Sequence, residues 1–239
     1  MNVGRIAEIF RFPVKSMAGM PTDTIELGWH GLDGDRRFAF RRAADRSGFP
    51  WLTASRLPEL VRYSPFKLDG SAEDGLPTHV RTPAGRELEL ESPELRAELA
   101  ERFGGEVDLL RMHGGIFDEA PVSLISLATV AGIGREAGLD LDHRRFRANL
   151  VIETDRPEPF LEDGWVGRTV KFGDGDPGPA VSVMLCDARC KMINLDPDTA
   201  APETGVLKTV GRLNQGNAGV YATVVRTGTI RVGDRVTLA

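Results

Sequence analysis

Two cysteines, Cys186 and Cys190, lie four positions apart in the sequence. In an extended chain their α-carbons would be ~13 Å apart, well beyond the roughly 4.4–6.8 Å of a disulfide, so we expect the two thiols to have different roles. Cys190 lies between Arg189 and Lys191. A cationic setting favours the thiolate, the form that binds a metal or attacks an electrophile. A free cysteine is more often a small buried hydrophobic residue, and that alternative stays open for Cys190.

Basic residues, most of them near a hydroxyl or amide side chain, recur in separate segments of the chain. They are Lys15 with Ser16, Arg36, then Arg56 with Thr53 and Ser55, and Arg147 with Asn149. Such pairs of a cation and a small hydrogen-bonding group suit an anionic phosphate ligand. For any one segment alone, a solvated surface charge is the favoured interpretation.

Composition excludes several classes of protein. The 239 residues include 30 Lys and Arg against 35 Asp and Glu, a formal net charge of −5, which argues against a nucleic-acid partner. Two cysteines are too few for a protein-held iron–sulfur cluster, and four scattered histidines do not suggest a structural zinc site. Residues 173–178 match G-x-G-x-x-G, but two aspartates there would repel a pyrophosphate and no helix is predicted to follow.

The sequence suggests a cytoplasmic protein with reduced thiols and no membrane partner. Its longest apolar runs fall far short of the ~20 residues that span a bilayer. The first twenty residues carry Arg5, Glu8, Arg11 and Lys15, and they lack the apolar centre of a signal peptide.

Short strand-like segments between glycine turns predict a mostly β protein with a few helices, an α+β barrel or sandwich core with helical additions. Helices are expected over residues 92–103, 126–136 and 202–212, the first with a Ser-Pro-Glu start signal. The expected strands cover residues 3–10, 23–27, 36–42, 60–68, 78–81, 87–90, 150–153, 169–172, 181–186, 191–195, 220–226 and 236–238.

A series of short motifs along nearly the whole chain resembles one family in order as well as in content. The motifs are FPVKS at 12–16, DRRF at 35–38, TASR at 53–56, DEAPVS at 118–123, FRANLVI at 146–152, CDARCKMINLDPDT at 186–199 and GTIRVGD at 228–234. Together they resemble MOSC-domain proteins, named after the C-terminal module of molybdenum cofactor sulfurase, that carry an N-terminal β-barrel domain. The resemblance implies a β-barrel MOSC core at 111–239 and a smaller β-rich, barrel-like N-terminal domain at 1–110.

The same resemblance implies a bound molybdenum cofactor (molybdopterin) and a set of site residues. Cys190 would be the protein ligand to molybdenum, and Arg189 would flank the metal as a second catalytic residue. The residues implied in cofactor binding are Lys15, Ser16, Arg36, Thr53, Ser55, Arg56, Asp118, Ala120, Arg147 and Asn149. One cysteine suffices as a ligand when the dithiolene of the cofactor supplies the other sulfurs.

The activity implied by the resemblance is a molybdenum-dependent oxidoreductase that reduces small N-hydroxylated compounds, as amidoxime-reducing and hydroxylaminopurine-reducing relatives do. Electrons would come from a separate donor protein of ferredoxin, flavodoxin or cytochrome type. Two alternatives stay open: a sulfur carrier that holds a persulfide on Cys190, and a cofactor-binding module without turnover. Pyridoxal phosphate is not favoured, because a Schiff base needs a suitably placed lysine and only Lys15 lies near a recognised motif.

Overall fold

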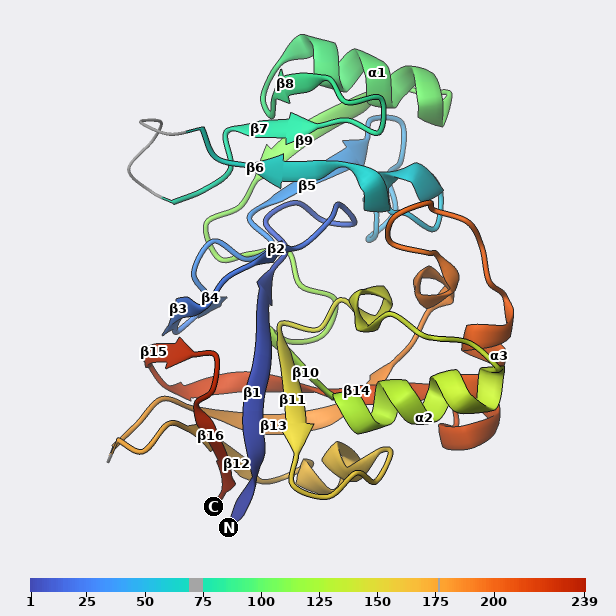
Figure 1. Ribbon diagram of the computed structural model, residues 1–239. Helices are drawn as coiled ribbons and strands as arrows, with labels where there is room; N and C mark the ends of the chain where they lie inside the picture. The colour runs from blue at the N-terminus through green and yellow to red at the C-terminus, as the bar shows by residue number, and fades with distance from the viewer. Residues whose placement is uncertain (69–74, 176) are drawn as a thin grey trace.

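Seven strands close into a β-barrel in the lower half of the molecule (Figure 1). The structure is a computed structural model that describes residues 1–68, 75–175 and 177–239, so Asp176 of the glycine-rich match lies outside the described residues. The barrel strands, in spatial order, are β11 (Leu150–Thr154), β10 (Val122–Ser126), β14 (Asn217–Arg226), β13 (Ala180–Ala188), β12 (Thr169–Phe172), β16 (Arg235–Leu238) and β1 (Asn2–Arg11). Pairing of β1 with β11 closes the ring. The short strand β2 (Met20–Pro21) pairs antiparallel with the end of β1.

All neighbours in the barrel run antiparallel except β10 and β11, which are parallel. Apolar residues such as Ile6, Leu124 and Val220 fill the interior and are at most 1% exposed. Polar residues such as Arg5, Glu153 and Arg235 alternate with apolar ones and face outward, as the two-residue period of a strand requires. The expected mostly β fold class is therefore confirmed.

Two of the three α-helices in the described residues pack on one side of the barrel, α2 (Leu127–Ala137) and α3 (Gly205–Asn214). The hydroxyl of Ser126 caps α2 by accepting a hydrogen bond from the amide of Thr129 at 3.0 Å. The helix ends at Gly138, whose φ of 69° is accessible to glycine at little cost. Ile133 of α2 and Val210 of α3 belong to the core that joins these helices to the barrel.

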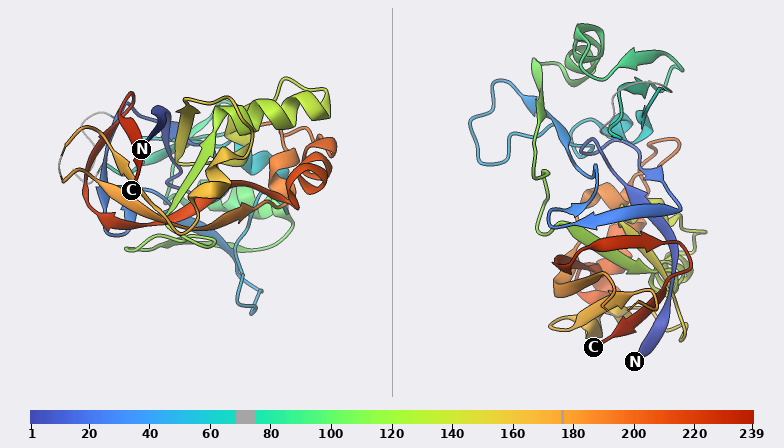
Figure 2. Two further views of the ribbon diagram at one scale, coloured as in Figure 1. Left: turned by 90° about the horizontal axis from the view of Figure 1, so that it is seen from below. Right: turned by 90° about the vertical axis from the view of Figure 1, so that its left-hand side faces the viewer.

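The upper part of the molecule has a separate hydrophobic core, which lies between two small sheets and the helix α1 (Pro93–Phe103) (Figures 1 and 2). One sheet pairs β5 (Phe38–Arg42) with β9 (Val107–Arg111), and the other contains β6 (Ser64–Phe66), β7 (His79–Arg81) and β8 (Glu87–Glu89). A 3₁₀ helix, η1 (Pro58–Arg62), precedes β6, and α1 follows β8. A third sheet contains β15 (Gly228–Arg231), β3 (Thr24–Gly28) and β4 (Gly31–Leu32). In it, a strand from the C-terminal part of the chain pairs with one from the N-terminal part.

The first strand belongs to the barrel although it lies far from the other barrel strands in sequence. β1 pairs with β11 and β16, and it buries Val3, Ile6 and Ile9 in the barrel core. Residues 1–110 thus contribute a barrel strand as well as the upper sheets. The domain boundary at residue 110 stays a prediction.

Two expected strands are wrong in whole or in part. Residues 191–195 form a 3₁₀ helix, η4 (Lys191–Asn194), because a short alternation of apolar and polar residues also fits one tight turn whose buried side is Ile193. The segment 60–68 is divided between η1 and β6. The expected strands do not include β2, β4, β9, β10 and β15. Further 3₁₀ turns are η2 (His143–Phe146) and η3 (Leu161–Trp165).

No helix in the described part of the chain is long and apolar enough to cross a membrane.

Candidate functional site

A cavity of about 870 Å³ lies where loops of the upper part meet the barrel and the segment that follows β13. Ten of the twelve predicted site residues line it, although they come from widely separated stretches of sequence. They are Lys15, Ser16, Arg36, Thr53, Ser55, Arg56, Asp118, Arg147, Arg189 and Cys190. We refer to this cavity as the large cavity.

Three residues of the cavity lining have a left-handed backbone conformation. Among the described residues, six that are not glycine have a positive φ, and three of them are Ser16 (67°), Arg36 (49°) and Arg147 (53°). Such conformations are uncommon for residues with a Cβ atom and persist only where the surroundings impose them, often at functional sites. Arg147 takes this conformation as the residue that ends η2.

Lys15 is held at the cavity wall by an ion pair. Its side chain is only 4% exposed, and its Nζ donates to Oδ1 of Asp118 at 2.8 Å. Burial lowers the pKa of Lys15, with partial compensation from Asp118. Burial also opposes the charge of Asp118, but the ammonium of Lys15 outweighs it and holds the pKa of that carboxyl below its usual range. The carboxyl of Asp118 is therefore charged at neutral pH.

Arg36 and Arg147 form the deepest cationic part of the cavity. Nε of Arg36 lies 3.3 Å from Oδ2 of Asp35, and burial opposes the charge of Arg36 while Asp35 raises its pKa. The guanidinium of Arg147 lies 4.3 Å above the ring of Phe12, and its Nη1 donates to the carbonyl of Met17 at 2.6 Å. Burial, then repulsion from Arg36, lowers the pKa of Arg147 to about 9. Its Nη2 is buried and has no hydrogen-bond partner among the residues that the structure describes.

Cys190 is exposed and directly precedes η4. The neighbouring Arg189 is only 7% exposed, and its guanidinium donates to the carbonyls of Ala218 and Phe146 at 2.7 Å each. Arg189 thus ties the segment carrying Cys190 to β14 and to η2. The structure assigns it a positioning role that the sequence did not indicate.

Asp187 is a wall residue that the sequence reasoning missed. It is 2% exposed, accepts a hydrogen bond from the hydroxyl of Ser123 at 3.2 Å, and lies 2.8 Å from Nη2 of Arg189. Burial raises its pKa to about 6 despite the pull of Arg189. Tyr221, opposite on β14, has its pKa raised to about 12 by burial and by Asp187. The available signal was an acidic residue three positions before Cys190, in the best-matching motif.

Two predicted residues do not line the large cavity. The side chain of Asn149 is fully used inside the protein, because Oδ1 accepts from the amide of Ser123 at 3.1 Å and Nδ2 donates to the carbonyl of Phe10 at 3.2 Å. Asn149 therefore joins β1, β10 and the start of β11. Ala120 is 8% exposed and lies beyond the lining.

The lining is cationic in an acidic protein. Seven Lys or Arg residues and four Asp or Glu residues line the large cavity, an excess of three positive charges in a chain of net charge −5. Together with the unpartnered Nη2 of Arg147, this excess fits an anion such as a phosphate. The described residues contain no group of three or more His, Cys, Asp or Glu that could hold a metal ion unaided.

Comparison with known families and proteins agrees with this geometry. The chain matches the MOSC domain over residues 110–237 and the MOSC N-terminal beta barrel domain over residues 3–105. It is similar to human mitochondrial amidoxime-reducing component 1, with 25% identity over 293 residues that cover 99% of this chain and 83% of the human protein. The fold is similar to that of the YUAD protein from Bacillus subtilis, with a TM-score of 0.54 and 14% identity over 99% of this chain and 95% of the other.

Proposed function

The chain belongs to the MOSC-domain family. From this premise we propose that the large cavity binds a molybdenum cofactor and that the protein uses it to reduce N-hydroxylated compounds. The observation that carries the proposal is the convergence of an exposed cysteine and a surplus of cations, one with an unpartnered nitrogen, on one cavity. Molybdopterin matches this set because it combines a phosphate with a metal that accepts thiolate sulfur. The reaction class rests on similarity to a protein named for reducing amidoximes.

In this proposal the cations bind and orient the cofactor. Lys15, Arg36 and Arg147, deep in the cavity, would hold the cofactor, with Arg56 nearer the opening. The hydroxyls of Ser16, Thr53 and Ser55 offer hydrogen bonds from the same wall. Cys190 supplies the thiolate ligand, and Arg189 fixes the backbone that presents it.

The bound cofactor would supply the two-electron chemistry that cleaves the N–O bond. The overall reaction takes two electrons and two protons, converts the N-hydroxyl compound to the corresponding N–H compound, and releases water. Asp187 is half protonated near pH 6, so its carboxyl can hold one of these protons in the cavity wall. We propose that the electrons come from a separate protein of ferredoxin, flavodoxin or cytochrome type, because two cysteines are too few for a cluster in this chain.

A sulfur carrier is the second candidate, favoured by the exposure of Cys190 at the cavity opening. A persulfide there would be accessible to an acceptor, and it would need no resident cofactor. The buried cations argue for the first candidate, because a persulfide carrier has little use for Arg36 and Arg147 in the depth of the same cavity.

The test is reduction of an N-hydroxylated base by protein from a host that makes the cofactor, with a chemically reduced viologen dye as the electron donor. We expect turnover by the natural chain and none by Cys190→Ala. Cofactor-loaded protein without turnover would support a binding module instead. Absence of cofactor, together with a persulfide detected by mass spectrometry on Cys190, would support the sulfur carrier.

A further inference from the structure

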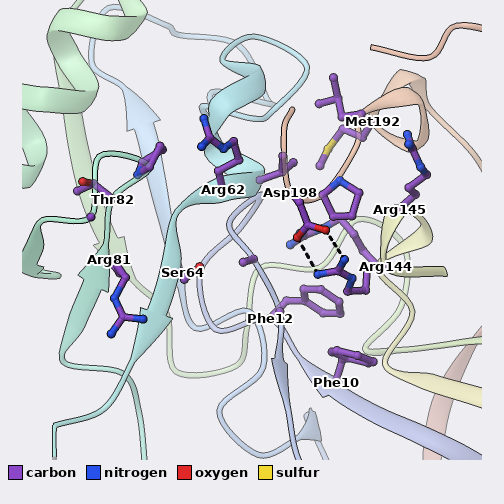
Figure 3. A pocket seen from close by; sticks show the side chains of 18 residues that line it. Phe10, Phe12, Arg62, Ser64, Arg81, Thr82, Arg144, Arg145, Met192 and Asp198 are labelled. Carbon is purple, nitrogen blue, oxygen red and sulfur yellow. Dashed lines mark hydrogen bonds and ion pairs between the residues drawn. The ribbon is translucent and has the colours of Figure 1, made fainter. Parts of the chain in front are cut away.

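A second cavity, of about 440 Å³, lies next to the large one (Figure 3). It is bounded by η1, β6 and the β7–β8 turn on one side and by residues of η2, η4 and the following loop on the other. Arg145, Arg147 and Met192 line both cavities and form the wall between them. Its volume falls in the range of small-molecule sites. We refer to it as the arginine cavity, because arginines supply most of its charged lining.

Five arginines and a single carboxylate, that of Asp198, supply its charged lining. The arginines are Arg62, Arg81, Arg144, Arg145 and Arg147. Arginine presents a planar fork of donors that matches phosphate oxygens, and it stays charged over the whole physiological pH range. The lining therefore suits a dianionic phosphate better than a neutral or cationic ligand.

Some of these arginines already have partners in the protein. Arg144 pairs with Asp198, as Figure 3 shows, at 2.7 Å and with Asp142 at 2.6 Å. Arg81 pairs with Glu87 at 2.7 Å. These pairs set the cavity wall and leave part of its donor capacity unused.

The unused donors are specific. Among the described residues, Arg62 makes no hydrogen bond or ion pair with another, although it lines the cavity. Arg145 pairs with Asp196 at 3.0 Å and its side chain is 10% exposed, but its Nε is buried without a hydrogen-bond partner among the described residues. A buried donor without an acceptor is costly, and an oxyanion in this cavity would supply the missing acceptors.

The rest of the lining indicates what is attached to the phosphate. Ser64 contributes an exposed hydroxyl at the edge of the cavity. The apolar side chains are Phe10, Phe12, Ala18, Val61, Pro83, Met192, Leu195 and Pro197. Apolar and charged residues on one small cavity fit a ligand with a compact organic part and one phosphate group.

We propose that the arginine cavity binds a small phosphate monoester, as a site separate from the one that would hold the cofactor. The proposal does not depend on molybdenum chemistry, since Arg62, Arg81 and Arg144 line only the arginine cavity and Lys15, Arg36 and Arg56 line only the large one. Residues confined to one cavity provide variants that separate the two sites.

The test is calorimetric titration of the purified full chain with phenyl phosphate at low ionic strength, with inorganic phosphate and phenol as comparison ligands. We expect phenyl phosphate to bind more tightly than inorganic phosphate and phenol not to bind. Arg62→Gln should weaken phenyl phosphate binding about tenfold, the effect of one charge-assisted hydrogen bond. Arg96→Gln, an exposed change of equal charge on α1, should leave it unchanged.

Lys15→Gln separates this site from the large cavity. Phenyl phosphate binding should persist in Lys15→Gln, and molybdenum content should persist in Arg62→Gln. Binding that survives Arg62→Gln undiminished, or that is lost in Lys15→Gln, would overturn the proposal. So would equal affinities for inorganic phosphate and phenyl phosphate, which would identify a site for the free ion. The activity of the large cavity enters none of these outcomes.

Discussion

Replacing Asp187 with asparagine removes a carboxyl whose charge the folded protein disfavours. The side chain is 3% exposed, and burial raises its pKa from the ordinary 3.8 to about 6. The folded state therefore binds this proton more tightly than the unfolded state. By linkage, the contribution of this group to stability falls as the pH rises from about 4 to about 6.

The expected size follows from the shift. A difference of about two pKa units corresponds to about 3 kcal/mol, because each unit is worth about 1.4 kcal/mol. The attraction of Arg189 is already included in this shift. An asparagine stays neutral at every pH, so Asp187→Asn should match the natural chain below pH 4 and exceed its stability by up to about 3 kcal/mol at pH 7.

The assay is urea unfolding of the cofactor-free natural chain and of Asp187→Asn, at a series of pH values from 4 to 8. The quantity of interest is the difference between their free energies of unfolding at each pH, since other titrating groups cancel. A difference that does not change with pH, or that favours the natural chain increasingly as the pH rises, would refute the reasoning.

Asp118→Asn gives a control of opposite sign. Burial raises the pKa of Asp118, but Lys15 lowers it further, so its net pKa lies below the ordinary value. Its charged form stabilises the fold above the ordinary pKa, and this contribution is lost on acidification through the lowered value. Asp118→Asn should therefore be less stable than the natural chain at neutral pH, with a gap that closes in acid. Because the side chain is 45% exposed, only the direction is expected to be clear.

Two further predictions concern the cofactor and the helix start. Arg147→Gln should lower the molybdenum-to-protein ratio more than it lowers the melting temperature, because the residue lines the cavity with an unpartnered nitrogen; an unchanged ratio would contradict its role. Ser92→Ala should cost about 1 kcal/mol in urea unfolding, since the hydroxyl of Ser92 caps α1 by accepting from the amide of Leu95 at 3.2 Å; a Ser92→Asp control should retain most of the stability.

Local signals in the sequence predicted much of the fold. The serine cap and the proline at the start of α1 indicated where this helix begins to within a residue. The strand β10 was overlooked, because a run of five fully buried residues lacks the alternation of a half-buried strand. The turn at Lys191–Asn194 depends on tertiary packing of Ile193, which a period of two residues cannot distinguish from a strand.

Site residues could be predicted from the sequence where a charge or a motif indicated them. Their burial, and the chemistry that depends on burial, could not be predicted. Lys15, Arg36 and Arg147 could be named as cations, but their burial and positive φ values appear only in the folded chain. Asn149 was recognised from its motif, yet the structure shows its polar atoms satisfied within the protein. The raised pKa of Asp187 arises from the burial of its carboxyl, which only the folded chain shows.

The most direct test of the central claim is the molybdenum content of protein produced in a host that makes the cofactor, measured by mass spectrometry beside two cysteine variants. Cys190 lines the large cavity, whereas Cys186 is outside its lining and half-buried. We expect about one molybdenum per chain in the natural protein and in Cys186→Ala, and none in Cys190→Ala. Metal retained in Cys190→Ala, or absent from the natural protein, would contradict the account.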